Sequence, residues 1–158
     1  MRRKDREVTD QAEIWAMLGR CDTVRLGIQG EEAPYVVPVS FGMALEDGQR
    51  VIYFHCAREG RKLELLQKHP VVCVEADRCL GIEPTAHGIT ARYESVIGVG
   101  TCELVEDEAA VIRGLKALLA HYGCGDYDLS HCGALSRTAV GRVVLSSLTG
   151  KHNLPEGV

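Results

Sequence analysis

A cationic turn ahead of a predicted helix is the feature of this sequence that most directly suggests chemistry. The segment Val51–Leu66 predicts a strand, a turn at Gly60, two adjacent cations (Arg61 and Lys62) and then a helix. A helix N-terminus favours anions through its free N–H groups and its dipole. A guanidinium and an ammonium there add a fork and a point charge for phosphate oxygens. The turn lacks the GxxxxGK[ST] spacing of a Walker P-loop, so it indicates a phosphate monoester site of another kind, with a solvated cationic turn as the alternative.

Other chemistry-bearing side chains give weaker signals. His55 ends the strand ahead of the turn, where an isolated histidine is more often a structural hydrogen-bonding residue than a catalyst. Asp126 and Asp128 lack the glycine and terminal glutamate of a calcium loop, and no Gly-x-Ser-x-Gly elbow is present for a hydrolase. A further set of possible ligands comprises His121, Cys124, His131 and Cys132. Its spacing matches no zinc motif, so we expect no metal site.

Length and composition restrict the class of protein. The chain has 158 residues, of which 46% are hydrophobic and 25% charged, so we expect a single globular domain over residues 1–158. A net charge of −4 argues against nucleic-acid binding. Residues 2–7 mix four basic with two acidic side chains, which favours a solvated arm. The sequence has no long apolar run and no hydrophobic leader, so we expect neither a membrane span nor a signal peptide. Seven cysteines, without a Cys-x-x-Cys motif, indicate reduced thiols in the cytoplasm.

Hydrophobic periodicity predicts three helices and six strands. The helices are expected over Asp10–Gly19, Gly60–Lys68 and Asp107–Tyr122. The strands are expected over Val24–Gln29, Tyr35–Met43, Val51–Cys56, Val71–Val74, Ala91–Val105 and Ala139–Leu148. We interpret residues 77–88 as an irregular loop, whereas residues 123–137 show no interpretable pattern. The hairpin signal at Glu46–Gly48 and the glycines Gly98 and Gly100 favour an antiparallel sheet that curls into a small closed or split barrel.

Local signals refine this scheme at three places. Pro38 cannot donate a ladder hydrogen bond, so its strand should have an edge or a bulge there, and a bulge beside Ser40 would face a ligand. Asp10 and Glu13 have the spacing of a helix capping box. Lys151 and Asn153 follow the last expected strand and are typical of a solvated tail.

In this order, five segments resemble a known family. They are Arg2–Asp10, Pro34–Phe41, Tyr53–Leu63, Tyr93–Gly100 and Leu148–Asn153. The sequence resembles the FMN-binding split-barrel family related to pyridoxamine 5′-phosphate oxidase, and within it the nitroimidazole-resistance (Nim-like) branch. The most specific element is His-x-Ala-x-x-Gly-Arg-Lys, which starts at His55. The C-terminal Trp and Arg signature of the oxidase itself is missing, and the single tryptophan is Trp15, so the resemblance does not extend to the vitamin substrate.

The resemblance implies a mainly β (α+β) fold, a six-stranded antiparallel split β-barrel with flanking helices. It also implies a homodimer with two FMN molecules at the subunit interface. By this resemblance Arg61 and Lys62 bind the flavin phosphate, and His55 is the active-site residue that donates a proton or binds the substrate. The residues implied to contact the cofactor, besides these two cations, are Val37, Pro38, Val39, Ser40, His55, Cys56, Ala57, Ser95 and Val96.

The implied activity is FMN-dependent reduction or oxidation of a small molecule, for example a nitroimidazole-type nitro compound, with NAD(P)H or another electron donor. Two alternatives remain open. One is a non-enzymatic flavin or haem binding module for storage or sensing, and the other is a structural dimer with a degenerate pocket. Related split barrels include haem binders and deazaflavin enzymes, so the fold alone does not fix the cofactor.

Overall fold

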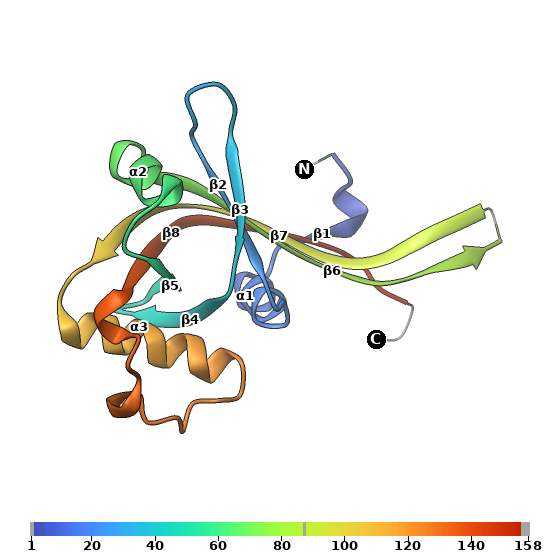
Figure 1. Cartoon of the computed structure of the whole chain (residues 1–158). Coiled ribbons are helices and arrows are strands. Elements are labelled where there is room, and N and C mark those ends of the chain that lie inside the picture. Colours follow the sequence, from blue (N-terminus) through green and yellow to red (C-terminus); the bar gives the residue numbers. More distant parts are fainter. Residues whose placement is uncertain (1, 87, 156–158) are drawn as a thin grey trace.

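The computed structural model describes residues 2–86 and 88–155 (Figure 1). Its three α-helices are α1 (Gln11–Gly19), α2 (Arg61–Lys68) and α3 (Glu108–His121). Its eight strands are β1 (Glu7–Val8), β2 (Val24–Ile28), β3 (Tyr35–Val39), β4 (Phe41–Glu46), β5 (Gln49–Ala57), β6 (Val71–Thr85), β7 (Gly88–Val105) and β8 (Thr138–Asn153). Short 3-10 helices occur at Lys4–Arg6, Leu129–His131 and Leu135–Arg137. No helix among the described residues is long and apolar enough to cross a membrane.

One antiparallel sheet holds all of these strands. Its order is β3-β2-β6-β7-β8-β5-β4, and β1 pairs with β8. The two end strands, β3 and β4, follow one another directly through Ser40, so the curled sheet forms a barrel that is split between its two edges. The prediction of an antiparallel split barrel with flanking helices is therefore confirmed.

The predicted number of six strands is wrong. The run Tyr35–Met43 breaks at Ser40 into β3 and β4, and Glu7–Val8 of the expected arm pairs with β8. Lys151 and Asn153, expected in a tail, belong to β8. Pro38 lies in an edge strand as predicted, because β3 pairs only with β2 in the described structure.

The largest difference concerns residues 77–88, which we expected to form a loop. They continue β6 and turn into β7, and Figure 1 shows the two strands running together away from the barrel. A register shift between Cys79 and Gly81 makes Leu80 a bulge in this ribbon. The ribbon lacks the hydrophobic alternation of a strand with one covered face, which is why its sequence did not indicate a strand.

Two apolar clusters form the interior. The first fills the barrel under α1 and includes Ile14, Leu26, Phe41, Ile52 and Phe54. The second lies between the sheet and α3 and includes Val51, Tyr53, Val111 and Val140. Strand β5 contributes alternate residues to the two clusters, so it is buried on both faces. Each such aliphatic side chain contributes about 1.5–3 kcal/mol by leaving water.

Helix α1 begins at Asp10, whose side chain accepts a hydrogen bond from the Ala12 N–H at 2.8 Å. This confirms the cap, but the capping box is wrong, because Glu13 bonds Arg20 at 2.7 Å instead. Arg20 also binds the buried carboxylate of Glu94 at 2.5 Å. This bond ties the end of α1 to β7.

A polar cluster anchors β4 against β5 and β8. The Tyr53 hydroxyl donates to Glu46 Oε1 at 2.5 Å, and Arg142 Nε and Nη2 donate to Glu46 Oε2 at 2.9 and 2.7 Å. Burial raises the pKa of Glu46, but these hydrogen bonds and the positive charge of Arg142 lower it by more. The net result is a Glu46 pKa below its ordinary value.

Substitution of Glu46 by glutamine should therefore destabilise the fold in a pH-dependent way. A carboxylate whose pKa is lowered on folding stabilises the protein above its unfolded pKa, and this stabilisation is lost as the pH falls through the folded value. We expect Glu46→Gln to lower the free energy of unfolding by about 1–3 kcal/mol at pH 7. The difference should be smaller at pH 3, below the ordinary pKa of glutamate, because protonation of the carboxylate then begins to remove the contribution of its charge. Urea denaturation at the two pH values tests this, with the exposed Glu32→Gln as control; an equal difference at both would contradict the role of the charge.

Candidate functional site

The turn between β5 and α2 leaves a helix N-terminus open. Gly60, which precedes the helix, has φ 120° and ψ 166°, a region that essentially only glycine occupies. A Cβ there would meet no atom within 4 Å, so conformation rather than space requires the glycine. No side chain caps the first N–H groups of α2. The Leu63 N–H bonds the Gly60 carbonyl oxygen at 3.0 Å, so in the described structure the N–H groups of Arg61 and Lys62 are the ones left for an anion.

The two predicted cations lie in the first turn of α2. The guanidinium carbon of Arg61 is 5.3 Å from the centre of the Tyr35 ring in β3, and Lys62 Nζ is 5.3 Å from the centre of the Phe54 ring in β5. Within the described part of the chain, neither cation makes a hydrogen bond or ion pair with a protein acceptor, whereas Lys68 at the other end of the helix pairs with Glu31. Lys62 is half-buried as a residue, and its ammonium has no carboxylate partner among the described residues.

Two thiols, those of Cys56 and Cys102, lie near enough to Lys62 to feel its charge. Burial raises the pKa of Cys56, and the charge of Lys62 opposes this only in part. Burial also raises the pKa of Cys102 to about 12. Both thiols are therefore protonated at neutral pH and leave the charge of Lys62 uncompensated. The turn has the electrostatics of an anion site.

The predicted strand Val37–Ser40 starts beside this turn. Tyr35, which lies under Arg61, belongs to the same strand β3. Val37 and Val39 face the barrel interior, with Val39 buried, whereas Pro38 and Ser40 are exposed. One backbone edge of β3 has no strand partner among the described residues, so it can offer N–H and C=O groups to a ligand.

The structure places His55 on a different face from Lys62. Residues alternate along β5, so Cys56 packs toward the first cluster near Lys62, while His55 points to the side of α3. There His55 lines a cavity of about 220 Å³ whose other walls are mostly apolar. The remaining residues of its wall are Leu115, Leu118, Leu119, Tyr127, Leu129, Cys132, Ala134, Leu135 and Thr138. Ala57 follows two residues later and is exposed.

The sequence analysis missed most of this wall, because residues 123–137 showed no periodicity. The only local signal there is Asp128, whose side chain accepts from the Ser130 N–H at 2.9 Å and starts the 3-10 helix Leu129–His131. His121, one of the possible metal ligands, instead contacts the Cys21 carbonyl oxygen at 2.9 Å. The side chain of His131 lies outside what the structure describes. No group of three potential metal ligands occurs among the described residues.

Ser95 and Val96 lie apart from the turn. Ser95 is half-buried on the outer face of β7, and its partner across the ladder is Lys151. The Val96 side chain is 2% exposed and points into the core, so only its backbone could reach a ligand. The register of β2, β6 and β7 aligns Tyr35 with Gly100, which is five residues, or about 17 Å, along β7 from Ser95. The assignment of these residues to a cofactor stays a prediction.

Comparison with known proteins identifies the family. The family model described as pyridoxamine 5′-phosphate oxidase matches residues 10–152. A solved structure of a candidate 5-nitroimidazole antibiotic resistance protein from Bacteroides thetaiotaomicron is similar, with 28% identity and a TM-score of 0.80, over 92% of this chain and 85% of that chain.

Two further solved structures have the same fold at lower identity. The flavocytochrome Anf3 from Azotobacter vinelandii has 22% identity and a TM-score of 0.79, over 98% of this chain and 72% of that one. An FAD and haem binding protein from Mycobacterium smegmatis has 18% identity and a TM-score of 0.77, over 97% of this chain and 77% of that one. A search of curated proteins finds no match. The extent of the family match shows that this chain belongs to the pyridoxamine 5′-phosphate oxidase family.

Proposed function

We propose that this protein is an FMN-dependent oxidoreductase of a small molecule and that it acts as a homodimer in the cytoplasm. The observation that carries the proposal is the open N-terminus of α2, where Arg61 and Lys62 lie without a carboxylate partner in the described chain. A phosphate monoester fits this site in charge and in hydrogen-bonding capacity. The seven free cysteines are in keeping with a reducing compartment.

In this proposal the phosphate, the rest of the cofactor and the substrate are bound by different parts of the chain. Arg61, Lys62 and the N–H groups of α2 hold the phosphate, and the free edge of β3 holds the rest of the cofactor through its backbone. The flavin, when bound, supplies transfer of two electrons. His55 binds the polar end of the substrate and donates a proton from a ring N–H, while the apolar wall behind it excludes water.

A small nitro compound is the substrate class we favour. The 28% identical Bacteroides protein, described as a candidate for 5-nitroimidazole resistance, supports this choice. The cavity beside His55 is apolar and, at about 220 Å³, smaller than the roughly 300–1,000 Å³ of drug-sized ligand sites. Reduction of a nitro group to a nitroso group consumes two electrons and two protons and releases water. A proton donor such as His55 is therefore needed.

A non-enzymatic flavin or haem module is the second candidate. The names of the Azotobacter and Mycobacterium structures, which mention a flavocytochrome and haem, favour it. The small volume of the His55 cavity argues against a haem in that place. Turnover separates the two candidates: a binding module would hold its cofactor but would not pass electrons from NADPH to a nitroimidazole.

The first experiment is an absorption spectrum of the purified protein, followed by titration with FMN and riboflavin. We expect flavin absorbance, and we expect FMN to bind more tightly than riboflavin, which has the same ring but no phosphate. A thermal shift with FMN gives an independent measure, because a ligand of the folded state raises its stability. A protein that neither carries nor takes up flavin would overturn the proposal. Equal affinity for FMN and riboflavin would show that the α2 turn does not bind the phosphate.

A further inference from the structure

The first residues of the chain lie beside the last residues of its final strand. Strand β1 pairs with β8, with Glu7 opposite Lys151 and Val8 opposite Gly150. The 3-10 helix Lys4–Arg6 therefore lies against the end of β8. Figure 1 shows both chain ends on the side of the sheet away from α2. None of these residues takes part in the proposed function.

A cavity of about 330 Å³, which we call the terminal cavity, lies between these two segments. Its volume is at the lower end of the roughly 300–1,000 Å³ of small-molecule sites. Its wall is formed by Arg3, Asp5, Arg6, His152, Asn153 and the two residues that follow. This wall is mostly polar, in contrast to the apolar cavity beside His55. It suits a small polar ligand.

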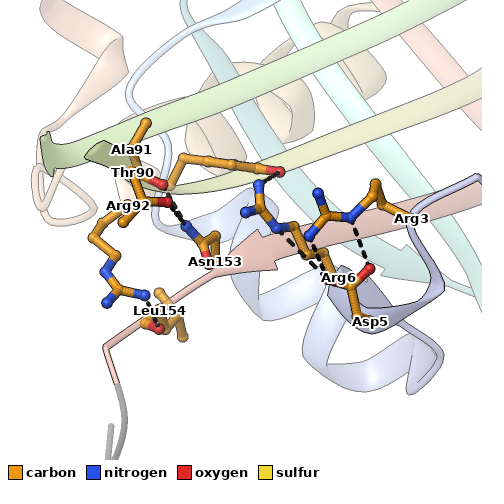
Figure 2. A network of polar contacts seen from close by, with 9 residues as sticks. Arg3, Asp5, Arg6, Thr90, Ala91, Arg92, Asn153 and Leu154 are labelled. Carbon is orange, nitrogen blue, oxygen red and sulfur yellow. Dashed lines mark hydrogen bonds and ion pairs between the residues drawn. The ribbon is translucent and has the colours of Figure 1, made fainter. Parts of the chain in front are cut away.

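The protein holds the cations of this wall in place. Arg3 donates to both carboxylate oxygens of Asp5, from Nε at 2.8 Å and from Nη2 at 2.5 Å (Figure 2). Hydrogen bonding from Arg3 lowers the pKa of Asp5 to about 2, so this carboxylate is charged and balances Arg3. Arg6 Nη1 donates to the Tyr93 hydroxyl at 3.4 Å, and Arg6 Nε is 3.9 Å from Asp5 Oδ2. The charge of Arg6 is therefore only partly balanced within the described chain.

The opposite side of the terminal cavity is fixed by the ribbon of β6 and β7. Arg92 Nη1 donates to the Leu154 carbonyl oxygen at 2.8 Å, and the Asn153 amide donates to Thr90 Oγ1 at 2.9 Å (Figure 2). Arg92 also pairs with Glu83 across the ribbon. The residues at the end of β8 are thus tied to the ribbon. A site whose walls are fixed beforehand binds its ligand with a smaller loss of conformational entropy.

His152 brings an unused hydrogen-bonding group to the cavity. Its imidazole makes no hydrogen bond or ion pair with the described residues, and its Nδ1 is buried. Most buried polar side-chain atoms have a partner, so an imidazole without one calls for an explanation. Nε2 is not among the buried atoms, so it is the ring nitrogen that a ligand can reach. A ligand in the terminal cavity would give this ring its first partner.

The surroundings of the terminal cavity are basic, although the chain as a whole is acidic. Lys151 Nζ lies 5.3 Å from the centre of the Tyr93 ring. Burial raises the pKa of Tyr93, but the hydrogen bonds and charges of Arg6 and Lys151 lower it by more. Residues 2–7 and Lys151 together hold five cations and two carboxylates, whereas the net charge of the chain is −4. A phosphate monoester, with about two negative charges at pH 7, compensates this excess better than one carboxylate does.

We propose that the terminal cavity binds a small phosphorylated polar molecule, such as a sugar phosphate. Arg6 and the remaining N–H groups of Arg3 bind the phosphate, because a guanidinium can donate two parallel hydrogen bonds to phosphate oxygens. The rest of the polar wall, His152 included, binds the hydroxyl groups of the ligand. This site is separate from the α2 turn and does not depend on the proposed function.

The first test is calorimetric titration of the wild-type protein with three probes. We expect ribose 5-phosphate to bind, and ribose, which lacks the phosphate, to bind at least about tenfold more weakly. Gluconate, which has hydroxyl groups but a carboxylate in place of the phosphate, should also bind more weakly than ribose 5-phosphate. Absence of ribose 5-phosphate binding would overturn the inference. Equal or tighter binding of gluconate would overturn the assignment to a phosphate.

Variants then locate the binding of ribose 5-phosphate. Arg6→Gln should weaken it at least about tenfold with an unchanged circular dichroism spectrum. The matched control is Lys4→Gln, which removes the same charge from the same 3-10 helix at a side chain outside the cavity wall, and should change the affinity less than about twofold. Equal losses in both would reduce the effect to general charge attraction. Loss in Lys62→Ala but not in Arg6→Gln would place the probe at the α2 turn, and either result contradicts the inference.

A second test follows the histidines of the wild-type protein by nuclear magnetic resonance. Ribose 5-phosphate should shift the ring signals of His152, which the variant His152→Gln identifies by their disappearance. The ring signals of His55, in the apolar cavity, and of His69, at the end of α2, should stay in place. Shifts confined to His55 or His69, or no shift at all, would show that the terminal cavity does not bind the probe.

The two proposals can fail separately. A protein that binds ribose 5-phosphate through Arg6 but takes up no FMN would overturn the flavin and leave the terminal cavity standing. A protein that binds FMN through Lys62 but does not bind ribose 5-phosphate would overturn the terminal cavity alone.

Discussion

Replacement of Lys62 by alanine should weaken FMN binding by about 1–3 kcal/mol, which is a roughly 5- to 150-fold rise in Kd. The ammonium of Lys62 has no carboxylate partner in the described structure, and the thiols of Cys56 and Cys102 near it are neutral. A phosphate would therefore be its first full counter-charge. Fluorescence titration with FMN measures the loss. The same variant should bind riboflavin as well as the wild type does, because riboflavin carries no phosphate.

The matched control for this variant is Lys68→Ala. Lys68 belongs to the same helix, but it lies at the opposite end and pairs with Glu31 at 3.2 Å. Loss of this exposed ion pair should leave the FMN affinity unchanged. If Lys62→Ala also leaves it unchanged, the phosphate is bound elsewhere and the assignment of the α2 turn is wrong. If both variants lose affinity equally, the effect is the net charge of the helix and not a specific contact.

The sequence predicted correctly those helices and strands that have one buried face and one exposed face. Helix α3 and strand β2 place apolar residues at regular intervals because one side of each is buried and the other is exposed to solvent. The ribbon was missed for the opposite reason. Its apolar side chains Leu80 and Ile82 face water, and Asp77 and Glu83 are exposed as well, so no buried face imposes a period on residues 77–88. The break at Ser40 was missed because the residues on both sides are β-formers and no turn residue marks it.

The candidate site also has a part that could be predicted from the sequence and a part that could not. The cationic turn was predictable, because Gly60, Arg61 and Lys62 are adjacent in sequence and need only a helix start to act together. The face to which His55 points was not, because Val51–Phe54 are all buried and the alternation of β5 is invisible in an apolar run. The wall of its cavity comes from α3 and from residues 127–138, which the fold brings to β5 from a distant part of the sequence.

Loss of the His55 imidazole should separate catalysis from cofactor binding. His55 lines the cavity on the α3 side, away from Lys62, so His55→Ala should change the FMN Kd by less than about tenfold. Turnover of a nitroimidazole with NADPH should fall by roughly 10²–10⁴-fold, the usual contribution of a positioned acid or base. The drop should appear in kcat, since the apolar walls that bind the substrate are retained.

The control His69→Ala removes an imidazole at the end of α2, away from the cavity, and should leave both values unchanged. Added imidazole should restore part of the rate in the His55 variant, because a free base can enter the space that the side chain leaves. Rescue is the readout that a structural role would not give. Equal losses of FMN affinity and of kcat, without rescue, would instead mean that His55 holds β5 against the residue 127–138 segment, and the acid that serves the substrate would have to be sought on another element.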